Sequence, residues 1–437
     1  MKILFVAVNR EKRPIPVIPY GMCWVAAALR EKGHEVEACD LMFAEDPRQE
    51  LSRVIKGFNP QLIGVSIRNT DNQDFHDQKC YGPEIKEVID CCKEVTDAPM
   101  VLGGPGFSSK PEAMLRYLGL DIGIVGDGEW AMGEVVGKIN SPRDIAGIPG
   151  VAMLTDGKFY YQPARLIERL DNLPSPAVDL IDYKKYQANT GVGSVQTKRG
   201  CSFNCLYCQI LDYHGHAERL RSPGRIADDI ETLIKEYGIN YLYFTDNLFN
   251  HPRKHAEDIC QELLRRKLEV QWSSYFHPRF IDRQFIQLIK GCGCAEILFN
   301  TGTITRVEKD EPGVDLECLR QSISICQAEG LKFTHFIFFG APGDDLATLE
   351  RIFEIMEEVE EPSQFFILYS MPVFPGARIF DLAREEGIIS GITAEPTFYT
   401  PSIVDEAIKD YIHQSCEKHT NWFYTLKGAD YLLRNQG

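Results

Sequence analysis

The sequence lacks any apolar run long enough to cross a membrane, and it is poor in positive charge. Its 437 residues carry a formal net charge of −16. This excess of acidic residues disfavours a broad nucleic-acid-binding surface, and the missing apolar run disfavours a membrane protein. The chain opens on a strand-like segment, residues 2–6, without a signal-peptide pattern. We therefore expect a cytoplasmic protein that binds neither nucleic acid nor membrane.

Other absences exclude further classes of protein. No G-x-G-x-x-G opens a helix, which weakens a dinucleotide-binding interpretation. Internal repeats and low-complexity segments are also missing. The 14 cysteines come without a secretory signal, and they fit a reducing compartment in which thiols bind metals or pack as small apolar side chains. The length predicts two or three domains.

One cysteine loop dominates what is present. Cys201, Cys205 and Cys208 have C-x3-C-x2-C spacing directly after a predicted strand. Three thiolates on so short a loop can bind three irons of one [4Fe–4S] cluster and leave the fourth iron open to a small molecule. Gly200 permits the tight turn before the first ligand, and two aromatic residues, Phe203 and Tyr207, supply apolar cover. The alternatives are a zinc site or three buried thiols, but a structural zinc site needs four ligands.

This loop resembles the signature of the radical S-adenosylmethionine superfamily, and the resemblance covers roughly residues 190–395. It implies that Cys201, Cys205 and Cys208 are the cluster ligands. It also implies that S-adenosylmethionine chelates the open iron through its amine and carboxylate, with Tyr207 near the adenine. A low-potential electron donor of the flavodoxin or ferredoxin type is the expected partner.

From residue 194 onward, short apolar runs alternate with amphipathic helical segments. The predicted strands are 194–198, 241–245, 269–275, 296–299, 333–339 and 364–370. The predicted helices are 226–237, 255–266, 283–290, 316–328, 346–359 and 378–385. Six strand–helix repeats predict a parallel sheet curved into a partial barrel, with the active site at the carboxyl ends of its strands. Residues 395–437 read as a small helical cap.

The residues at these strand ends are candidate ligands of the cofactors. They are Asp246, Asn247, Asn300, Thr301, Phe339, Tyr369 and Met371. The Asp246 carboxylate could hold the cationic methionine amine, and its position resembles the family's amine-binding motif. Asn300 stands where many relatives have glutamate, and residues 340–344 resemble the glycine motif near the adenine. Ordinary loop chemistry is the alternative for each.

The N-terminal part predicts a doubly wound α/β unit. Its strands are expected at 3–8, 35–40, 61–67, 100–102 and 122–125, with a helix at 21–32. In such sheets ligands bind beyond the carboxyl ends of the strands, where the loops 9–20, 68–77 and 103–108 are unusual. The candidate binding residues there are Asn9, Tyr20, Ser66, Arg68, Asn69, Gly103, Gly104, Gly106, Phe107, Gly126 and Glu129. Simple turns are the alternative.

Placed before a radical S-adenosylmethionine core, this unit resembles a cobalamin-binding domain. The match lies in residues 16–21, 64–66, 103–104 and 126–129. It implies that the nucleotide tail of the corrin inserts near Ser66 and Gly104. The Asp-x-His-x-x-Gly loop of many cobalamin proteins is missing, so Arg68 or Asn69 is expected at the lower face of the cobalt. Arginine is a poor ligand because it stays protonated; His76 is the alternative, although an exposed loop histidine is the simpler interpretation.

The sequence thus predicts an α/β chain in four parts: a Rossmann-like cobalamin-binding domain at 1–145, a linker at 146–192 with a hairpin at 151–162, a six-unit partial barrel at 193–394 and a helical extension at 395–437. The resemblance implies a cobalamin-dependent radical S-adenosylmethionine methyltransferase acting on a carbon centre of a small molecule or peptide, with Arg68 and the three cysteines in catalytic roles. The alternatives are a non-methylating enzyme that closes or rearranges rings, and non-radical methyl transfer from cobalamin. Nothing in the sequence specifies the substrate.

Overall fold

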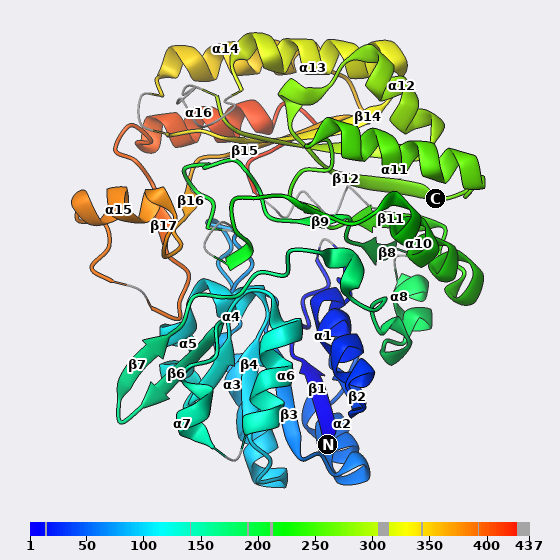
Figure 1. The fold of residues 1–437 in the computed structure, drawn as a ribbon. Coiled ribbons are helices and arrows are strands. Elements are labelled where there is room, and N and C mark those ends of the chain that lie inside the picture. The colour runs from blue at the N-terminus through cyan, green and yellow to red at the C-terminus, as the bar shows by residue number, and fades with distance from the viewer. Residues whose placement is uncertain are drawn as a thin grey trace.

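The computed structural model describes residues 1–425 except 14, 140, 190–191, 210–212, 305–313, 342–343 and 392. Two large sheets dominate the molecule, one in the N-terminal part and one in the C-terminal part (Figure 1). Each is flanked by helices. No helix in the described ranges has both the length and the apolar character needed to span a membrane.

The N-terminal sheet has seven strands in the order β2-β1-β3-β4-β5-β6-β7. The first five are parallel, as predicted for a doubly wound unit, and β6 and β7 are antiparallel. The bounds are β1 Lys2–Ala7, β2 Glu35–Asp40, β3 Leu62–Ser66, β4 Met100–Gly103, β5 Ile122–Ile124, β6 Val151–Thr155 and β7 Lys158–Tyr161. The predicted hairpin is therefore β6–β7, and it extends this sheet because β6 pairs with β5. That part of the predicted linker belongs structurally to the first sheet.

Helices cover both faces of this sheet, which explains why its strands are almost continuously apolar. Ile3 and Phe5 of β1 pack in the core on the side of α1 and α6, whereas Leu4 and Val6 pack on the side of α2 and α3. The helices are α1 Tyr20–Glu31, α2 Pro47–Phe58, α3 Gly82–Val95, α4 Pro105–Ser109, α5 Pro111–Leu118, α6 Gly128–Lys138 and α7 Pro142–Ile145. The connection to the second sheet contains η1 Leu170–Asn172, η2 Val178–Leu180 and α8 Tyr183–Asn189.

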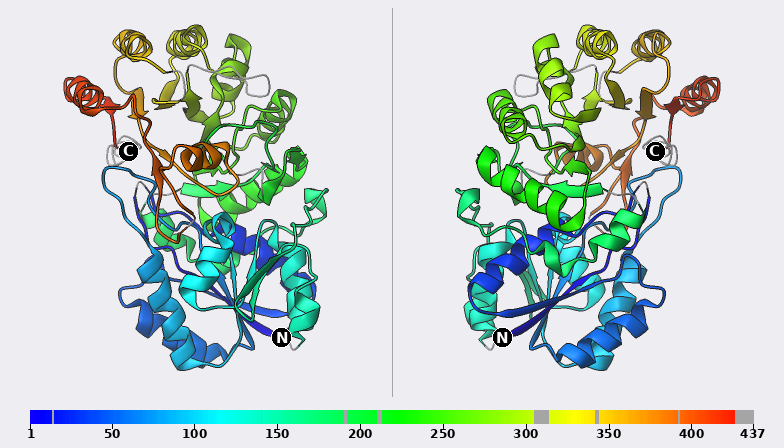
Figure 2. Two further views of the ribbon diagram at one scale, coloured as in Figure 1. Left: turned by 90° about the vertical axis from the view of Figure 1, so that its left-hand side faces the viewer. Right: turned by 90° about the vertical axis from the view of Figure 1, so that its right-hand side faces the viewer.

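The C-terminal sheet is parallel throughout, in the order β18-β15-β14-β13-β12-β11-β8. Its strands are β8 Val192–Val195, β11 Tyr241–Phe244, β12 Gln271–Phe276, β13 Cys294–Thr303, β14 Lys332–Phe338, β15 Gln364–Leu368 and β18 Trp422–Phe423. The chain passes through a helix between successive strands, and these helices lie on the outside of a curved sheet (Figure 2). They are α10 Pro223–Tyr237, α11 Arg253–Arg266, α12 Arg283–Gly291, α13 Leu316–Glu329 and α14 Leu346–Met356. The α/β fold predicted from the sequence is confirmed.

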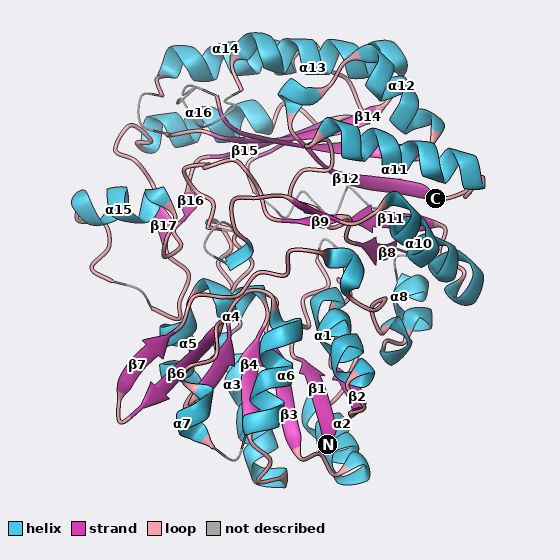
Figure 3. Cartoon of the chain, in the orientation of Figure 1, coloured by secondary structure: helices cyan, strands magenta, loops and turns pink. Residues whose placement is uncertain are grey.

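Two details of this half differ from the prediction. The strand expected at 194–198 is β8, which ends at Val195; the next residues form β9 Lys198–Arg199, which pairs antiparallel with β10 Arg219–Leu220. The cysteine loop therefore lies in the connection between the two strands of a short ribbon, of which β9 is labelled in Figure 3. The predicted helical cap contains α16 Glu406–Cys416, but β18 adds to the sheet beside β15. Residues 426–437 of the cap lie outside the described residues.

The remaining elements follow β12 and β15 in the chain. They are the short turn η3 Pro278–Phe280, the strand pair β16 Met371–Pro372 and β17 Phe398–Tyr399, and the helix α15 Arg378–Glu385. Trp422 of β18 stacks on Phe353 of α14 with ring centroids 5.4 Å apart. This contact buries Trp422 against the barrel.

Candidate active site between the two sheets

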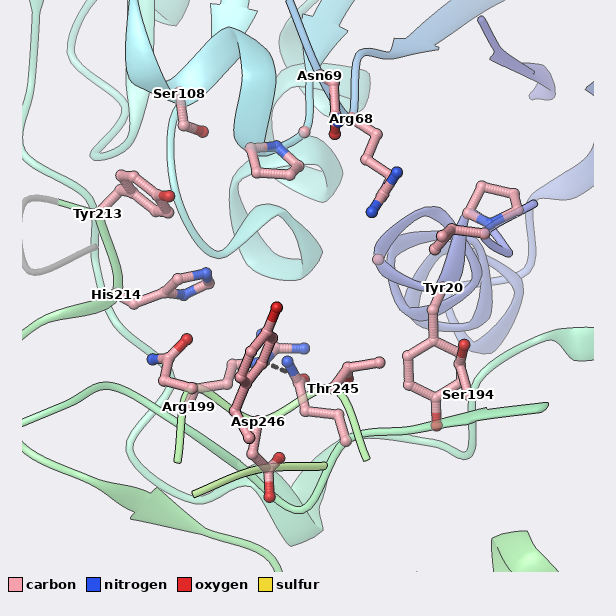
Figure 4. Close-up of a pocket in the computed structure, with 18 of the residues that line it drawn as sticks. Tyr20, Arg68, Asn69, Ser108, Ser194, Arg199, Tyr213, His214, Thr245 and Asp246 are labelled. Carbon is pink, nitrogen blue, oxygen red and sulfur yellow. Dashed lines mark hydrogen bonds between the residues drawn. The ribbon is translucent and has the colours of Figure 1, made fainter. Parts of the chain in front are cut away.

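A cavity of about 990 Å³ lies between the carboxyl ends of the two sheets. Ser66 and Gly103, at the ends of β3 and β4, line one wall, and Asp246 and Asn300 of the barrel line the other. Figure 4 shows Arg68 and Asn69 entering from the N-terminal sheet, with Thr245 and Asp246 on the opposite side. Because both sheets direct the loops at their carboxyl ends here, the two predicted ligand-binding edges form one site.

The cysteine loop lies on the wall of this cavity. Cys201, Cys205 and Cys208 all line it, and all three are half-buried. The Cys201 amide donates to the carbonyl of Gly215 at 3.2 Å, and the Cys208 amide donates to the carbonyl of Cys205 at 3.1 Å. Gly200 has a φ of +89°, and a Cβ there would lie 2.1 Å from the carbonyl oxygen of Ala217. Only glycine fits this turn, as the sequence indicated.

The three thiols suit an iron–sulfur cluster better than a single ion. Among the described residues, no three cysteine, histidine or acidic side chains converge closely enough to hold one metal ion. Ligands of a single zinc ion all lie about 2.3 Å from the same atom, whereas the three cysteines of a cluster each bind a different iron. The donor set, three cysteine thiols on one loop facing a cavity, therefore fits a [4Fe–4S] cluster with one open iron.

The end of β11 braces the cysteine loop. The buried Asp246 carboxylate accepts hydrogen bonds from the amide and hydroxyl of Thr197, the amide bond measuring 2.8 Å. Burial raises the pKa of Asp246, and the positive charge of Lys198 and the Thr197 hydrogen bonds oppose that rise. Asn247 donates to the carbonyl of Gly200 at 3.3 Å. Both predicted residues thus line the cavity, and both also hold the backbone next to Cys201.

The end of β13 contacts the cysteine loop from the other side. Tyr207 donates its hydroxyl proton to Asn300 Oδ1 at 3.0 Å. A Cβ at Gly302 would lie 2.9 Å from the Tyr207 hydroxyl oxygen, so the ring rests against glycine backbone. The buried Thr301 hydroxyl lies 2.7 Å from Nδ1 of His335. Burial lowers the pKa of His335 to about 3, so this imidazole is neutral.

The N-terminal wall leaves space for a large flat ligand. Gly21, at the start of α1, and Gly103, at the end of β4, both line the cavity. A Cβ on Gly21 would meet no atom within 4 Å, and one on Gly103 only the Ile124 carbonyl oxygen at 4.0 Å. Gly104 differs, because its φ is +93° and a Cβ would lie 2.5 Å from the Ile67 carbonyl oxygen. The open glycines form a cradle that side chains would fill, and this cradle fits the corrin of cobalamin.

Arg68 extends into the cavity from the end of β3 (Figure 4). Burial lowers the pKa of Arg68, and the nearby hydroxyls of Tyr243 and Tyr275 partly oppose that change. Within the described part of the chain, neither Asp71 nor Asp74 of the same loop forms an ion pair with Arg68. Asp71 accepts hydrogen bonds from its own loop, and so does Asp74. The guanidinium is therefore available to a ligand in the cavity.

His76 lies elsewhere. It lines an adjoining, smaller cavity of about 360 Å³ that shares seven lining residues with the larger one, but it does not line the larger one itself. Its Nδ1 lies 3.4 Å from the Tyr369 hydroxyl, and its ring packs edge-on against Tyr369, His413 and Tyr424. This position disfavours His76 as a cobalt ligand.

Glu129 takes part in a buried group of charges that joins the two halves of the chain. Its Oε1 accepts from Arg199 at 2.5 Å. Asp127 lies 3.3 Å from Arg199, accepts a short hydrogen bond from Arg219, and lies 3.5 Å from Nδ1 of His214. We call Asp127, Glu129, Arg199 and Arg219 the charge cluster. Arg199 belongs to β9 and directly precedes the cysteine loop, so the charge cluster ties the N-terminal unit to that loop.

Most of the predicted site residues line the cavity, but several do not. Those outside it are Asn9, Gly106, Phe107, Phe339, Tyr369 and Met371. Phe107, Phe339 and Met371 are fully or almost fully buried in the hydrophobic cores. Gly106 lies against backbone, since a Cβ there would be 3.0 Å from the Arg68 carbonyl oxygen. Side chains near a strand end point alternately into the cavity and into the core, and the sequence pattern does not show which of them face the cavity.

The cavity also contains residues that the sequence did not single out. They include Ser108, Ser194, Arg199, Tyr213, His214, Tyr243 and Tyr275. Tyr243 and Tyr275 are each the penultimate residue of their strand, β11 and β12. The alternation of side chains along the strands could therefore have identified them. Arg199 carried no such signal, because its partners are distant in the sequence.

Two family models match the chain. The B12 binding domain matches residues 7–136, and the radical SAM superfamily matches residues 195–356. These two ranges contain the N-terminal wall of the cavity and the cysteine loop. These matches confirm the two domain types that the sequence motifs indicated.

The relatives agree with this pair of domains. The chain is 26% identical over 401 residues to an uncharacterised methyltransferase of Pyrococcus horikoshii, covering 89% of this chain and 84% of that protein. It is 26% identical over 421 residues to tryptophan 2-C-methyltransferase of Streptomyces laurentii, covering 81% and 70%. The fold is similar to that of the radical S-adenosylmethionine methyltransferase TsrM of Kitasatospora setae, with a TM-score of 0.82, 23% identity, and coverage of 95% and 88%.

The glycine cradle that fits a corrin lies in the B12 binding domain, and the three thiols that fit a cluster lie in the radical SAM domain. The cofactors of this domain pair are cobalamin, a [4Fe–4S] cluster and S-adenosylmethionine. The chain thus has the two domains of a cobalamin-dependent radical S-adenosylmethionine enzyme, and it is similar to methyltransferases.

Proposed function

We propose that this enzyme transfers a methyl group from S-adenosylmethionine to a carbon atom of a small-molecule or peptide substrate. The observation that carries the proposal is the single cavity, because it brings the cysteine loop and the N-terminal cradle to the same space. A methyl group can pass between two cofactors only if both are exposed to a common volume. When bound, the cofactors supply methyl-transfer and radical chemistry that amino-acid side chains cannot.

The residues of the chain contribute position and solvent exclusion. Cys201, Cys205 and Cys208 would hold the cluster, and Asp246 and Asn247 hold the loop that carries them. We also propose that the cofactors contact a set of residues that line the cavity: Tyr20, Ser66, Arg68, Asn69, Gly103, Gly104, Gly126, Phe203, Tyr207, Asn300 and Thr301. We also propose an external low-potential electron donor of the flavodoxin or ferredoxin type, and domain bounds of 1–145, 193–394 and 395–437 around the connecting residues 146–192.

Product analysis tests this function. Enzyme reconstituted under anaerobic conditions with its three cofactors, a reductant and candidate substrates should release S-adenosylhomocysteine and a methylated product. Release of 5′-deoxyadenosine in proportion to product indicates a radical route, and its absence indicates a polar route. Turnover that yields 5′-deoxyadenosine and a cyclised or rearranged product, with no S-adenosylhomocysteine, would show that the enzyme is not a methyltransferase.

A second prediction concerns Arg68. Its guanidinium has no lone pair to offer a metal, and it would occupy the space beside the bound corrin, so it should keep water away from the cobalt. We expect Arg68→Ala to admit water there and to slow the release of S-adenosylhomocysteine, while cleavage to 5′-deoxyadenosine persists. The paramagnetic spectrum of bound cobalt(II) cobalamin reports the axial ligand directly.

Matched variants make the Arg68 prediction specific. Arg53→Ala, which removes an exposed arginine on α2, should leave the spectrum unchanged. His76→Ala should leave it unchanged as well, because His76 lies in the smaller cavity. An axial water signal already present in the wild type, or identical spectra for wild type and Arg68→Ala, would exclude this role.

A further inference from the structure

The smaller cavity lies where the N-terminal unit meets the barrel. Phe75 and His76, from the loop after β3, line one side, and Tyr369, after β15, and Tyr424 line another. Cys208 lines both this cavity and the larger one. A molecule bound in the smaller cavity would therefore lie beside the cysteine loop. Its volume of about 360 Å³ is within the usual range of small-molecule sites.

Its walls are predominantly aromatic. The rings include Phe75, Tyr275, Phe336, Phe338, Phe374 and Tyr424. Several of them are already paired: Tyr275 and Phe336 are 5.9 Å apart between centroids, and Tyr207 and Phe338 are 4.7 Å apart. Aromatic rings favour offset and edge contacts with other flat π-systems. Such walls suit a flat, apolar ligand.

Polar side chains interrupt these walls, among them Asn300, Ser370 and the hydrogen-bonded pair His76 and Tyr369, and Tyr369 also contacts His413, which does not line the cavity. The Tyr369 hydroxyl lies 3.4 Å from His76 Nδ1 and 3.0 Å from His413 Nε2. A tyrosine hydroxyl has one proton, so it can donate to one imidazole and must accept from the other. Burial lowers the pKa of both His76 and His413. The three side chains thus form an uncharged hydrogen-bonding group.

The two cavities differ in charge. The larger one is lined by Arg13, Arg68 and Arg199 together with five acidic residues, and two of these, Asp127 and Glu129, pair with Arg199. Among the described residues around the smaller one there is neither lysine nor arginine, and the sole carboxylate is that of Asp74. This carboxylate accepts from the amide of His76 at 2.9 Å, within its own loop. An anionic group entering this space would lose its hydration without a cation to replace it, which is costly.

We propose that the smaller cavity binds the part of the substrate that receives the methyl group, and that this part is a neutral, flat ring system with one polar group directed at His76 and Tyr369. This inference rests on the proposed function and adds the substrate class to it. It disfavours substrates whose reacting part carries a carboxylate or phosphate.

Binding of three naphthalene probes tests this class. The holoenzyme, with cobalamin, cluster and S-adenosylhomocysteine bound, is titrated under anaerobic conditions in a calorimeter with 2-naphthol, 2-naphthoate and 2-methylnaphthalene. We expect 2-naphthol to bind and 2-naphthoate to bind at least about tenfold more weakly, because its charge is unpaired there. Equal affinity for the two, or binding of 2-naphthoate alone, overturns the proposal.

A tyrosine variant locates the binding. Tyr369→Phe should weaken 2-naphthol binding roughly three- to tenfold, as expected for one hydrogen bond, and should change 2-methylnaphthalene binding by less than about twofold. Tyr411→Phe, which alters an exposed tyrosine on α16, serves as the matched control. Cobalamin content and far-ultraviolet circular dichroism verify folding. If correctly folded Tyr369→Phe binds 2-naphthol as the wild type does, the probe is not in this cavity and the proposal is wrong.

A separate assay keeps the two proposals distinguishable. The same preparations are supplied with S-adenosylmethionine and reductant, and S-adenosylhomocysteine is measured. Its formation together with the expected probe affinities supports the substrate class. Formation without binding of any probe overturns the substrate class and leaves the methyltransferase function intact.

Discussion

Replacing any one of Cys201, Cys205 and Cys208 by alanine should abolish turnover and remove most of the bound iron. Each thiolate would bind a different iron of the cluster, so no remaining side chain can substitute for a lost one. Among the described residues, the three thiols are the cysteines that line the larger cavity. We expect activity to fall below detection in each variant, together with loss of the cluster's visible absorption and iron content.

A fourth cysteine provides the control. Cys318→Ala removes a half-buried thiol on α13 that does not line either cavity, and it should retain iron and activity. Cobalamin binding should survive in all four variants, because the cradle belongs to the other sheet. Full iron content and activity in any variant of the loop would contradict the cluster assignment.

Replacing Asp127 by asparagine should destabilise the protein by about 3–5 kcal/mol, the cost of removing one partner from a buried group of charges. Asp127 and Glu129 together balance Arg199 and Arg219, and all four side chains are almost completely buried. In Asp127→Asn, Arg219 keeps its hydrogen bonds to the carbonyls of Ile167 and His214 but loses its carboxylate. Denaturant unfolding measures the change in the free energy of unfolding.

Two further variants make the measurement specific. Asp121→Asn, an exposed aspartate of the same unit, should change the free energy of unfolding by less than about 0.5 kcal/mol. The double variant Asp127→Asn with Arg219→Gln should recover part of the loss, because it removes the uncompensated charge. A loss for Asp127→Asn no larger than that for Asp121→Asn would show that the charge cluster does not hold the two halves together.

The same carboxylate predicts a pH dependence. Burial by itself raises the pKa of Asp127, but the neighbouring His214 side chain and the charges of Arg199 and Arg219 outweigh it, so the net pKa is well below its ordinary value. A lowered pKa in the folded state contributes stability above the unfolded value of about 4 and loses it as the pH falls further. The difference in the free energy of unfolding between wild type and Asp127→Asn should therefore be largest at neutral pH and decrease below about pH 4.

The features that the sequence alone predicted are those encoded over short distances. The cysteine spacing lies within eight positions of one loop, from Cys201 to Cys208, and Gly200 marks the turn before it. Each strand and helix in the two halves shows its characteristic spacing of apolar residues within one short segment. Because parallel strands direct their carboxyl ends to one edge, the positions of Ser66, Asp246 and Asn300 at the site also followed from local patterns.

Other features depended on pairs of residues that only the folded chain brings together. Glu129 was expected to contact a cofactor, yet its partner Arg199 is 70 positions away and belongs to the β9–β10 ribbon of the other half of the chain. His76 and Tyr369, separated by 293 positions, meet at the smaller cavity. Phe107 was placed at the cavity because of its loop, but its side chain fills the core. Local propensity decides whether a segment is a strand or a loop. The direction of a buried side chain depends instead on which partner it packs against or hydrogen-bonds to once it leaves water, and only the tertiary structure supplies that partner.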